Sequence, residues 1–376
     1  MTCTGSIDMS GPEYVLESPV EPAKLPEVRN HTPFPSQYFQ MMDTNDKVFH
    51  VLVSRLTFDL LSPDSKGAPQ LSQTQHPLVR ADEFYQQPNT SATIQESDFA
   101  PYKPRCDILF AHATAYAPNE KPLERWPIGI RIGDWSKKIS VCGPRRIVPA
   151  ALGWKLQAPK PAIQVPLRYE LAFGGTLQWP ETVAKDEEPE ILIRHPANPI
   201  GCGLLNAAWL KKARPHEMRA PQMEVFGQPF GETHLHKNDY PVIGLGAIGR
   251  WWSPRIQLAG SYDRQWQETR WPNLPRDFDS AYWNCAPADQ QIDYPQGGEE
   301  VVLAGLTPGG GSFRTRIPAP HPHALARLHA GPILPRRMNL DTLIFDMHAM
   351  TLTCVHRMVI AADAEVRVLE IRRREA

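Results

Sequence analysis

The chain has 376 residues, and 40 Lys and Arg nearly balance 41 Asp and Glu, giving a formal net charge of −1. This balance argues against a basic nucleic-acid binder, and 41% hydrophobic with 22% charged residues is ordinary globular usage. Proline, with 39 residues, is about twice as frequent as usual, which excludes long uninterrupted helices, an all-helical bundle and a coiled coil.

Residues 1–35 contain several prolines and scattered acids without a period, and we predict an irregular N-terminal extension. The apolar segments that follow predict short strands bounded by turn residues, at 48–60, 78–85, 107–117, 126–132 and 136–142. The last two flank Gly133, Asp134 and Trp135 and predict a hairpin. Alternation in 107–117 predicts one shared face for Ile108, Phe110, His112, Thr114 and Tyr116.

Proline is again concentrated in residues 144–166, which we interpret as a connector or edge crossing. Residues 36–376 then form one β-rich unit, or two lobes at 36–143 and 167–376 joined by this connector. Beyond it we expect helices at 204–213 and 263–269 and strands at 167–173, 256–260, 300–306, 313–317, 340–345, 351–358 and 365–372. This pattern predicts a mainly β fold with sandwich or barrel-like antiparallel sheets, few short helices and many Pro/Gly loops.

The six cysteines are widely spaced, and none forms a CxxC pair. They are Cys3, Cys106, Cys142, Cys202, Cys285 and Cys354. We favour buried free thiols in a reducing compartment over a disulfide framework or a zinc site. The opening sequence has no basic start followed by an apolar run, and no stretch approaches about 18 apolar residues. We therefore expect no signal peptide, no membrane span and a cytoplasmic, soluble protein.

Residues 244–249 satisfy the GxGxxG pattern of a dinucleotide site. That site needs the glycines between a strand and a helix, but Pro254 stops any helix soon afterwards, so we favour a glycine-rich loop of a β protein. His234 and His236 form an HxH pair on a possible strand face, and His321, His323 and His329 cluster in a Pro-rich loop. No third ligand with suitable spacing is visible, so we favour solvated or packed histidines and predict neither metal nor cofactor.

Several acidic residues could supply a carboxylate pair for acid–base chemistry, namely Asp82, Glu83, Glu96, Asp98, Asp277 and Asp279. Their separation along the chain says nothing about their distance in space, and surface turns explain them more simply. We therefore predict no catalytic residues.

Aromatic residues are concentrated in residues 250–289, where half of the ten tryptophans fall within 33 positions. The residues that stand out are Trp251, Trp252, Trp266, Trp271, Trp283 and Tyr262. Large rigid aromatics supply much buried area in a core or in an interface. We favour the core interpretation, with a partner-binding surface as the alternative.

A series of strings resembles a known bacterial family. In order they are ADEFY (81–85), ESDFAPYKP (96–104), DIL (107–109), PLRYELAFGGT (166–176), NPIGCG (198–203), GAIGRWW (246–252), SPR (253–255), AGSYD (259–263), LPRDFD (274–279), APADQ (286–290) and GLTPGG (305–310). Together they cover most of residues 45–320. The family is catalogued as domain of unknown function 2169 and accompanies type VI secretion gene clusters.

The resemblance implies a cytoplasmic adaptor or chaperone that holds a toxic effector and loads it onto the VgrG spike, sometimes with a PAAR-type tip. It brings no catalytic residues, and the matching residues look architectural, with Asp263 and Asp279 as turn or cap acceptors. Trp251 and Trp252 stand where a less aromatic pair is expected, and residues 318–335 are unusual. Two alternatives remain: a hydrolase using loop carboxylates or histidines, and a lectin-like β-sandwich in which Trp251 or Trp252 stacks on sugar rings.

Overall fold

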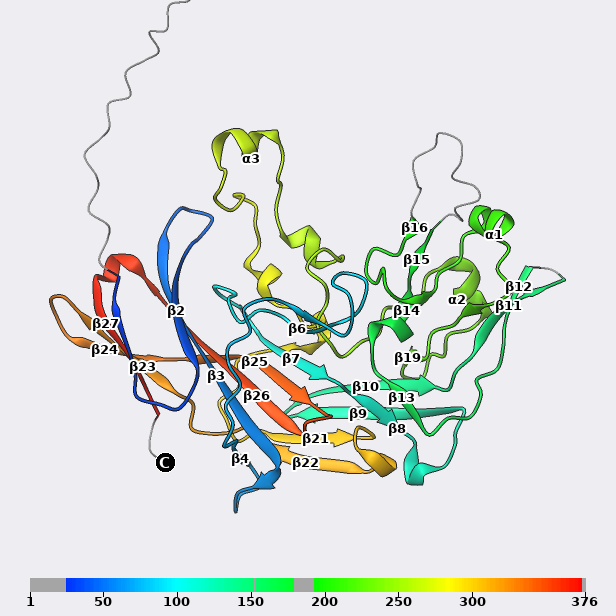
Figure 1. Ribbon diagram of the computed structural model, residues 1–376, viewed down its shortest axis with the longest axis horizontal. Coiled ribbons are helices and arrows are strands. Elements are labelled where there is room, and N and C mark those ends of the chain that lie inside the picture. The colour runs from blue at the N-terminus through cyan, green and yellow to red at the C-terminus, as the bar shows by residue number, and fades with distance from the viewer. Residues whose placement is uncertain (1–24, 152, 179–192, 374–376) are drawn as a thin grey trace, which may run out of the picture.

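The computed structural model describes residues 25–151, 153–178 and 193–373. Short strands dominate these ranges and form several sheets, none of which closes into a barrel (Figure 1). The prediction of a mainly β fold with few short helices is confirmed. Among the described residues the helices are α1 (Ala207–Ala213), α2 (Glu232–Lys237) and α3 (Arg264–Thr269), with the 3-10 turns η1 (Pro118–Glu120), η2 (Tyr169–Leu171), η3 (Arg255–Leu258), η4 (Ser280–Trp283), η5 (Ala288–Gln290), η6 (Pro308–Gly310) and η7 (Ala362–Ala364).

Three sheets form the larger part of the body. The seven-stranded sheet contains, in spatial order, β2 (Ser36–Met42), β3 (Val48–Pro63), β26 (Thr351–Ala361), β25 (Asn339–Asp346), β7 (Cys106–Ala111) and β20 (Gln291–Ile292), with β4 (Pro69–Leu71) paired to β3. The five-stranded sheet contains β19 (Met223–Val225), β10 (Trp135–Cys142), β9 (Arg125–Ile132), β21 (Glu300–Ala304) and β22 (Ser312–Arg316). The four-stranded sheet contains β1 (Glu27–Asn30), β27 (Val366–Arg372), β23 (His323–Leu328) and β24 (Ile333–Arg337).

The remaining sheets of the described residues are small. They are β12 (Gly153–Leu156) with β11 (Arg146–Ala150) and β18 (Met218–Arg219), β13 (Gln164–Pro166) with β8 (Thr114–Tyr116), β14 (Phe173–Gly174) with β17 (Cys202–Gly203), β15 (Thr176–Leu177) with β16 (Ile193–Arg194), and β5 (Glu83–Phe84) with β6 (Thr93–Gln95). Most pairs are antiparallel, as expected, but β1 with β27, β14 with β17, and β7 with β25 are parallel.

The largest apolar core lies between the seven-stranded and five-stranded sheets. Leu56 and Phe110 from the first sheet and Ile130 and Leu303 from the second belong to one cluster of buried side chains. Sheets that bury their inner faces against each other in this way form a sandwich. β3 is buried on both faces along most of its length. Leu52 lies on the same face as Leu56 but packs in a second cluster, with the four-stranded sheet, and Arg55 on the opposite face is buried against Asp98.

Several predicted elements are confirmed. The apolar run 48–60 is β3, and the hairpin of β9 and β10 turns at Gly133, whose φ of 54° suits a residue without a Cβ. Strands β21, β22, β25, β26 and β27 match the predictions between 300 and 372 within a few residues. Helices α1 and α3 fall within the two predicted helical ranges.

Other predictions were wrong. His112 has a φ of 49° and ends β7, so the single strand at 107–117 and its shared face do not form, and Leu109 is buried beside Phe110. The segments 167–173 and 256–260 turn into η2 and η3, because local 3-10 hydrogen bonds replace strand pairing there. Within 78–85 only Glu83–Phe84 is a strand.

Residues 144–166 also differ from the predicted connector, because they contain β11, β12 and β13. Strands from the ranges 36–143 and 167–376 pair within the same sheets, as β7 does with β25 and β3 with β26. The predicted N-terminal extension is not irregular throughout, since Glu27–Asn30 pairs with β27; its residues 1–24 lie outside the described ranges.

Five cysteines are free and buried, as predicted, and Cys3 lies outside the described residues. The five are Cys106, Cys142, Cys202, Cys285 and Cys354. Across the described parts of the chain, no helix has the length and apolar character needed to cross a membrane.

Candidate functional site

Residues 261–283, here called the arm, rise from the body beside the turn that joins β2 to β3 (Figure 1). The arm carries α3, which begins where the Asp263 side chain accepts a hydrogen bond from the backbone N–H of Trp266 at 2.8 Å. Asp279 caps η4 in the same way at Ala281. Both acids therefore act as the predicted cap acceptors.

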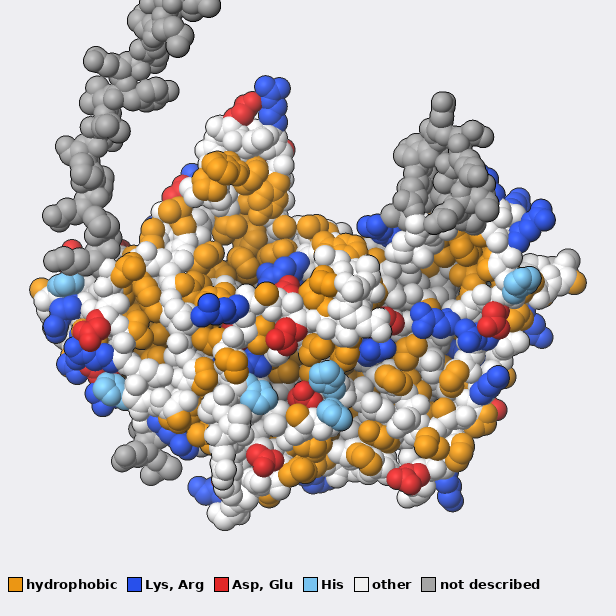
Figure 2. Space-filling model, in the orientation of Figure 1, with side chains coloured by type: hydrophobic (Ala, Val, Ile, Leu, Met, Phe, Trp, Pro, Cys, Tyr) orange, Lys and Arg blue, Asp and Glu red, His pale blue; other side chains and the backbone are white. Residues whose placement is uncertain are grey.

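A cavity of about 420 Å³, here called the arm groove, lies between the arm and the seven-stranded sheet. Its walls include Leu274, Phe278 and Trp283 from the arm and Tyr102 from the segment before β7. Figure 2 shows hydrophobic side chains on the arm and in the hollow beneath it. Apolar, partly open cavities of this size are the usual places where proteins bind ligands or partner side chains.

The floor of the arm groove is one face of the sheet at β2, β3 and β26. Phe49 faces Met41 across the β2–β3 pair, and Val51 faces Val359 across the β3–β26 pair. Side chains two residues apart on a strand share a face, so these four form a continuous apolar surface. The opposite face packs against the four-stranded sheet through residues such as Leu52.

The tip of the arm is fastened to the β2–β3 turn by a cluster of hydrogen bonds, here called the tip clasp. Arg270 donates to both carboxylate oxygens of Asp46, at 2.9 and 2.7 Å, and to the backbone carbonyl of Thr44 at 3.2 Å. Arg276 also donates to Thr44, at 3.1 Å. The hydrogen bond from Arg270 lowers the pKa of Asp46, so the clasp is charged at neutral pH.

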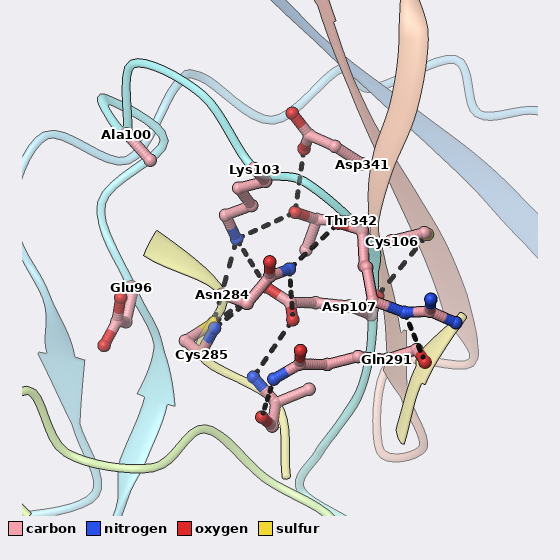
Figure 3. Close-up of polar contacts among 12 residues, drawn as sticks. Glu96, Ala100, Lys103, Cys106, Asp107, Asn284, Cys285, Gln291, Asp341 and Thr342 are labelled. Carbon is pink, nitrogen blue, oxygen red and sulfur yellow. Dashed lines mark hydrogen bonds and ion pairs between the residues drawn. The ribbon is translucent and has the colours of Figure 1, made fainter. Parts of the chain in front are cut away.

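The base of the arm is held by a buried polar cluster, here called the base network (Figure 3). Lys103 donates to Asp107 at 2.8 Å and to Thr342 at 3.0 Å. Asp107 also accepts from the Asn284 side chain at 2.9 Å and from the backbone N–H of Cys285 at 3.0 Å. The network therefore ties the residues that follow the arm to β7 and β25.

Electrostatics hold the base network in its charged form. Burial by itself would raise the pKa of the Asp107 carboxyl, but Lys103 and the surrounding donors lower it. Burial raises the pKa of the Cys285 thiol well above its ordinary value. This thiol is therefore neutral and poorly suited to act as a nucleophile.

Among the predicted acidic residues, Asp82 and Glu96 come together at Arg250, at 2.8 and 3.5 Å, but the arginine lies between them as their shared partner. Asp82 pairs with Arg250 at 2.8 Å, Asp98 with Arg55 at 3.0 Å, and Glu96 with Arg255. Glu83 accepts from Gln95, and Asp277 accepts from the Ser261 backbone and hydroxyl. Each acid thus serves as a partner for a cation or donor in the scaffold.

The predicted histidines are also dispersed. His234 and His236 lie in helix α2 and not on a strand face, and His234 contacts Asp239 at 3.1 Å. His321 packs edge-on against the buried His356. Burial lowers the pKa of His321 to about 4. In the ranges 25–151, 153–178 and 193–373, no three His, Cys, Asp or Glu side chains form a group that could hold a metal ion.

The GxGxxG segment is a loop with buried Leu245 and Ala247, and the next helical turn, η3, starts only at Arg255. Its Leu245 carbonyl accepts from the backbone N–H of Phe110 at 3.0 Å. The segment thus lacks the strand–loop–helix geometry of a dinucleotide site.

The six aromatic residues occupy three places. Trp252 is buried in the main core, and Trp251 lies beside it and donates to Asn89 at 3.0 Å. Tyr262, Trp266 and Trp271 belong to the arm, where Trp271 has an exposed fraction of 69%. Trp283 alone among them lines the arm groove. The core interpretation therefore holds for Trp252, whereas Trp271 is a surface residue and Trp283 lines a cavity.

Sequence reasoning missed the groove floor and the base network. The floor depends on the pairing of β2, β3 and β26, which are far apart in sequence. For the base network a signal existed, because Lys103 and Asp107 stand four positions apart at the start of a strongly apolar segment. A charged pair at the start of a buried strand must find partners, and this one does.

The family comparison gives a match over most of the chain. The model of the family described as "Uncharacterized protein conserved in bacteria (DUF2169)" matches residues 45–357. Comparisons with curated proteins and with solved structures find no match. The matched range contains the arm, the base network and most of the arm groove, and the chain is therefore a member of this bacterial family, DUF2169.

Proposed function

We propose that this protein is a non-enzymatic adaptor, or chaperone, that acts in the bacterial cytoplasm on a secreted effector of a type VI secretion system. It binds the effector and helps to load it onto the VgrG spike, either alone or with a PAAR-type tip. The secretion context comes from the family resemblance. The observation that carries the binding role is the arm groove, an apolar cavity of about 420 Å³ framed by a protruding arm.

The shape and chemistry of the arm groove support binding without catalysis. Phe278 and Trp283 supply rigid aromatic surface, and Met41 and Met42 supply side chains that adapt to different partners. Such a surface can hold apolar side chains of a client while the client remains chemically unchanged.

The two alternatives have less support. A hydrolase needs an acid and a base that can reach a substrate, whereas the acids considered above are bound to arginines or to backbone donors. A lectin-like site at Trp252 would need an exposed indole face, but this side chain is 2% exposed. Trp251 is half-buried and hydrogen-bonded to Asn89.

The test is co-purification of the full chain with the effector and the VgrG protein encoded beside its gene. We expect wild-type protein to retain the effector and Leu274→Glu to retain at least about tenfold less, because a carboxylate in an apolar groove lacks a partner. Leu61→Glu is the matched control, since Leu61 is 67% exposed near the far end of β3.

Both variants are first compared with wild type by thermal unfolding, so that only folded protein is scored. Equal retention by Leu274→Glu and Leu61→Glu would remove the arm groove from the client site. If wild-type protein retains neither the effector nor VgrG, the adaptor role itself is wrong. Turnover of a substrate that depends on Asp98 or Asp279 in folded protein would favour the hydrolase alternative.

A further inference from the structure

A second cavity adjoins the arm groove. It has a volume of about 160 Å³ and shares Tyr102 and Val359 with the groove, so the two hollows lie side by side. Four cationic side chains line it, Lys103, Arg336, Arg337 and Arg357, against one carboxylate, Asp341. We call this cavity the basic pocket.

Two of these cations have structural partners. Arg357 donates to Asp341 at 2.7 Å and to the Asp98 backbone carbonyl at 2.8 Å, and Lys103 is bound to Asp107. They are buried and belong to the scaffold. Their charges are largely neutralised by these two acids.

Arg336 and Arg337 differ, because within the described chain they have neutral partners only. Arg337 donates to the Gln296 side chain and to the Pro295 carbonyl and lies 3.2 Å from His321. Arg336 reaches the Pro335 carbonyl at 3.4 Å. Both are on β24, at the edge of the four-stranded sheet, and both are exposed. The basic pocket therefore carries positive charge that is open to an anionic group.

The arm groove also lies beside the edge of a sheet, at the end of β2. Met41 and Met42, which line the groove, are the last two residues of β2, whereas the backbone of Asp43 and Thr44 is already hydrogen-bonded within the β2–β3 turn and to Arg270 and Arg276. β2 is the terminal strand of its sheet and pairs only with β3 among the described strands. A free strand edge can accept an extended segment of another protein.

We propose that the arm groove and the basic pocket together bind an extended client segment in which an Asp or Glu side chain adjoins apolar side chains, either before or after them in the client sequence. This inference rests on the proposed adaptor function and names the chemistry of the client. The apolar side chains occupy the groove over Phe49 and Val51, and the carboxylate meets Arg336 and Arg337. Tyr102, shared by the two cavities, marks the boundary between the apolar and the anionic part of the segment.

The test measures binding of the full chain to an array of immobilised peptides. Each peptide carries three positions drawn from Leu, Val, Phe and Met, with Asp, Asn or Lys placed either before or after them. We expect the Asp peptides to bind about fivefold more strongly than their Asn counterparts, the effect of a partly exposed ion pair, and the Lys peptides to bind least.

Variant proteins test whether Arg336 and Arg337 cause the preference for Asp peptides. Arg336→Glu, alone and combined with Arg337→Gln, should abolish or invert the preference for Asp over Lys. Lys155→Glu makes the same charge change as Arg336→Glu at an exposed strand position on β12, and should leave the preference unchanged. Thermal unfolding of each variant confirms that the compared proteins are folded.

Three results would overturn the inference: no peptide in the array binds, Asp and Lys peptides bind equally, or the Arg336 variants keep the wild-type preference. Displacement of bound peptides by dodecanoate, with stronger binding of the fatty acid than of any peptide, would also overturn it in favour of a lipid ligand. If the effector still co-purifies in these cases, the adaptor function stands and only the assigned client chemistry is wrong.

Discussion

The two ends of the arm are held by the same kind of interaction in opposite surroundings. At the base, Lys103 and Asp107 are 6% and 0% exposed and share their hydrogen bonds with Asn284 and Thr342. At the tip, Arg270 pairs with Asp46, whose side chain is 38% exposed. Removing one partner of a buried pair leaves a charge without water or counter-ion, whereas water can replace a partner at the surface. We therefore expect the base network to contribute more to the stability of the fold than the tip clasp does.

The largest expected effect comes from Asp107→Ala, which removes the centre of the base network. Lys103 would keep only Thr342 as a strong partner, and the donors of Asn284 and Cys285 would lose their acceptor. We expect the free energy of unfolding to fall by about 3–5 kcal/mol. Urea denaturation followed by circular dichroism measures this loss.

Asp293→Ala is the control for this prediction, because the Asp293 side chain is 95% exposed and contacts Arg105 at 3.1 Å. Its loss should cost less than about 1 kcal/mol. A similar cost for Asp107→Ala and Asp293→Ala would show that the base network does not anchor the arm.

A smaller loss, about 1–3 kcal/mol, is expected for Lys103→Met, since Asp107 would still accept from Asn284 and Cys285. The variant should also respond less to acid. In wild type the pKa of Asp107 is lowered, so its carboxylate stabilises the fold above the unfolded value of about 3.9 and this contribution is lost as pH falls. Without Lys103 the pKa of Asp107 in the folded protein should rise, so that less stability is lost when the pH falls.

Thermal unfolding between neutral pH and about pH 3 measures this second effect. A steeper loss of stability in Lys103→Met than in wild type, or a larger cost than that of Asp107→Ala at neutral pH, would contradict the assigned roles of the two residues.

At the tip, Arg270→Ala should lower the free energy of unfolding by about 1–2 kcal/mol, because Arg270 is 11% exposed and also donates to the Leu274 carbonyl, whereas its partner Asp46 is 38% exposed. The arm should nevertheless open more often, because its bonds to Asp46 and Thr44 are gone. Hydrogen exchange followed by mass spectrometry should therefore be faster in residues 261–283 and unchanged in β7. Arg264→Ala is the matched control at the opposite end of α3, since Arg264 is 89% exposed and pairs only with Glu268 among the described residues.

Added salt should weaken the exposed tip clasp more than the buried base network in wild-type protein. Raising the ionic strength from about 0.1 M to about 1 M shortens the Debye length from about 10 Å to about 3 Å. Exchange should accelerate at the tip and stay constant around Asn284. Faster exchange around Asn284, with no change at the tip, would reverse the proposed roles of the two ends.

The smallest effect is expected at Cys285, the thiol of the base network. Burial raises its pKa, so iodoacetamide should leave it unmodified in folded protein and label it after unfolding in urea. Peptide mass spectrometry reads out both states. Rapid labelling of Cys285 in the folded protein would mean that the base is open to solvent, like the tip.

The sequence predicted those parts of the fold that depend on local patterns. The apolar run of β3, the glycine turn after Ile132 and the Asp263 cap all follow from neighbouring residues and are confirmed. Segments such as 256–260 failed because their apolar residues support a 3-10 turn as well as a strand. No local pattern distinguishes these two outcomes.

The candidate site was much less accessible to sequence reasoning. Trp283 was singled out as an aromatic, but its neighbour Tyr102 in the groove lies 181 positions earlier in the chain. Met41 on β2 and Val359 on β26 lie in the same surface only because β3 stands between these two strands and pairs with both. Long-range pairing of this kind leaves no trace in a single sequence.

The pairing of β7 with β25, and of β3 with β26, also constrains how the protein is made. These partners are more than 200 residues apart, so a ribosome exposes β3 and β7 long before their neighbours are synthesised. The seven-stranded sheet cannot be completed until nearly the whole polypeptide has emerged from the ribosome. A chain that stops before residue 339 would leave two apolar strands with open edges, and we expect such fragments to aggregate or be degraded.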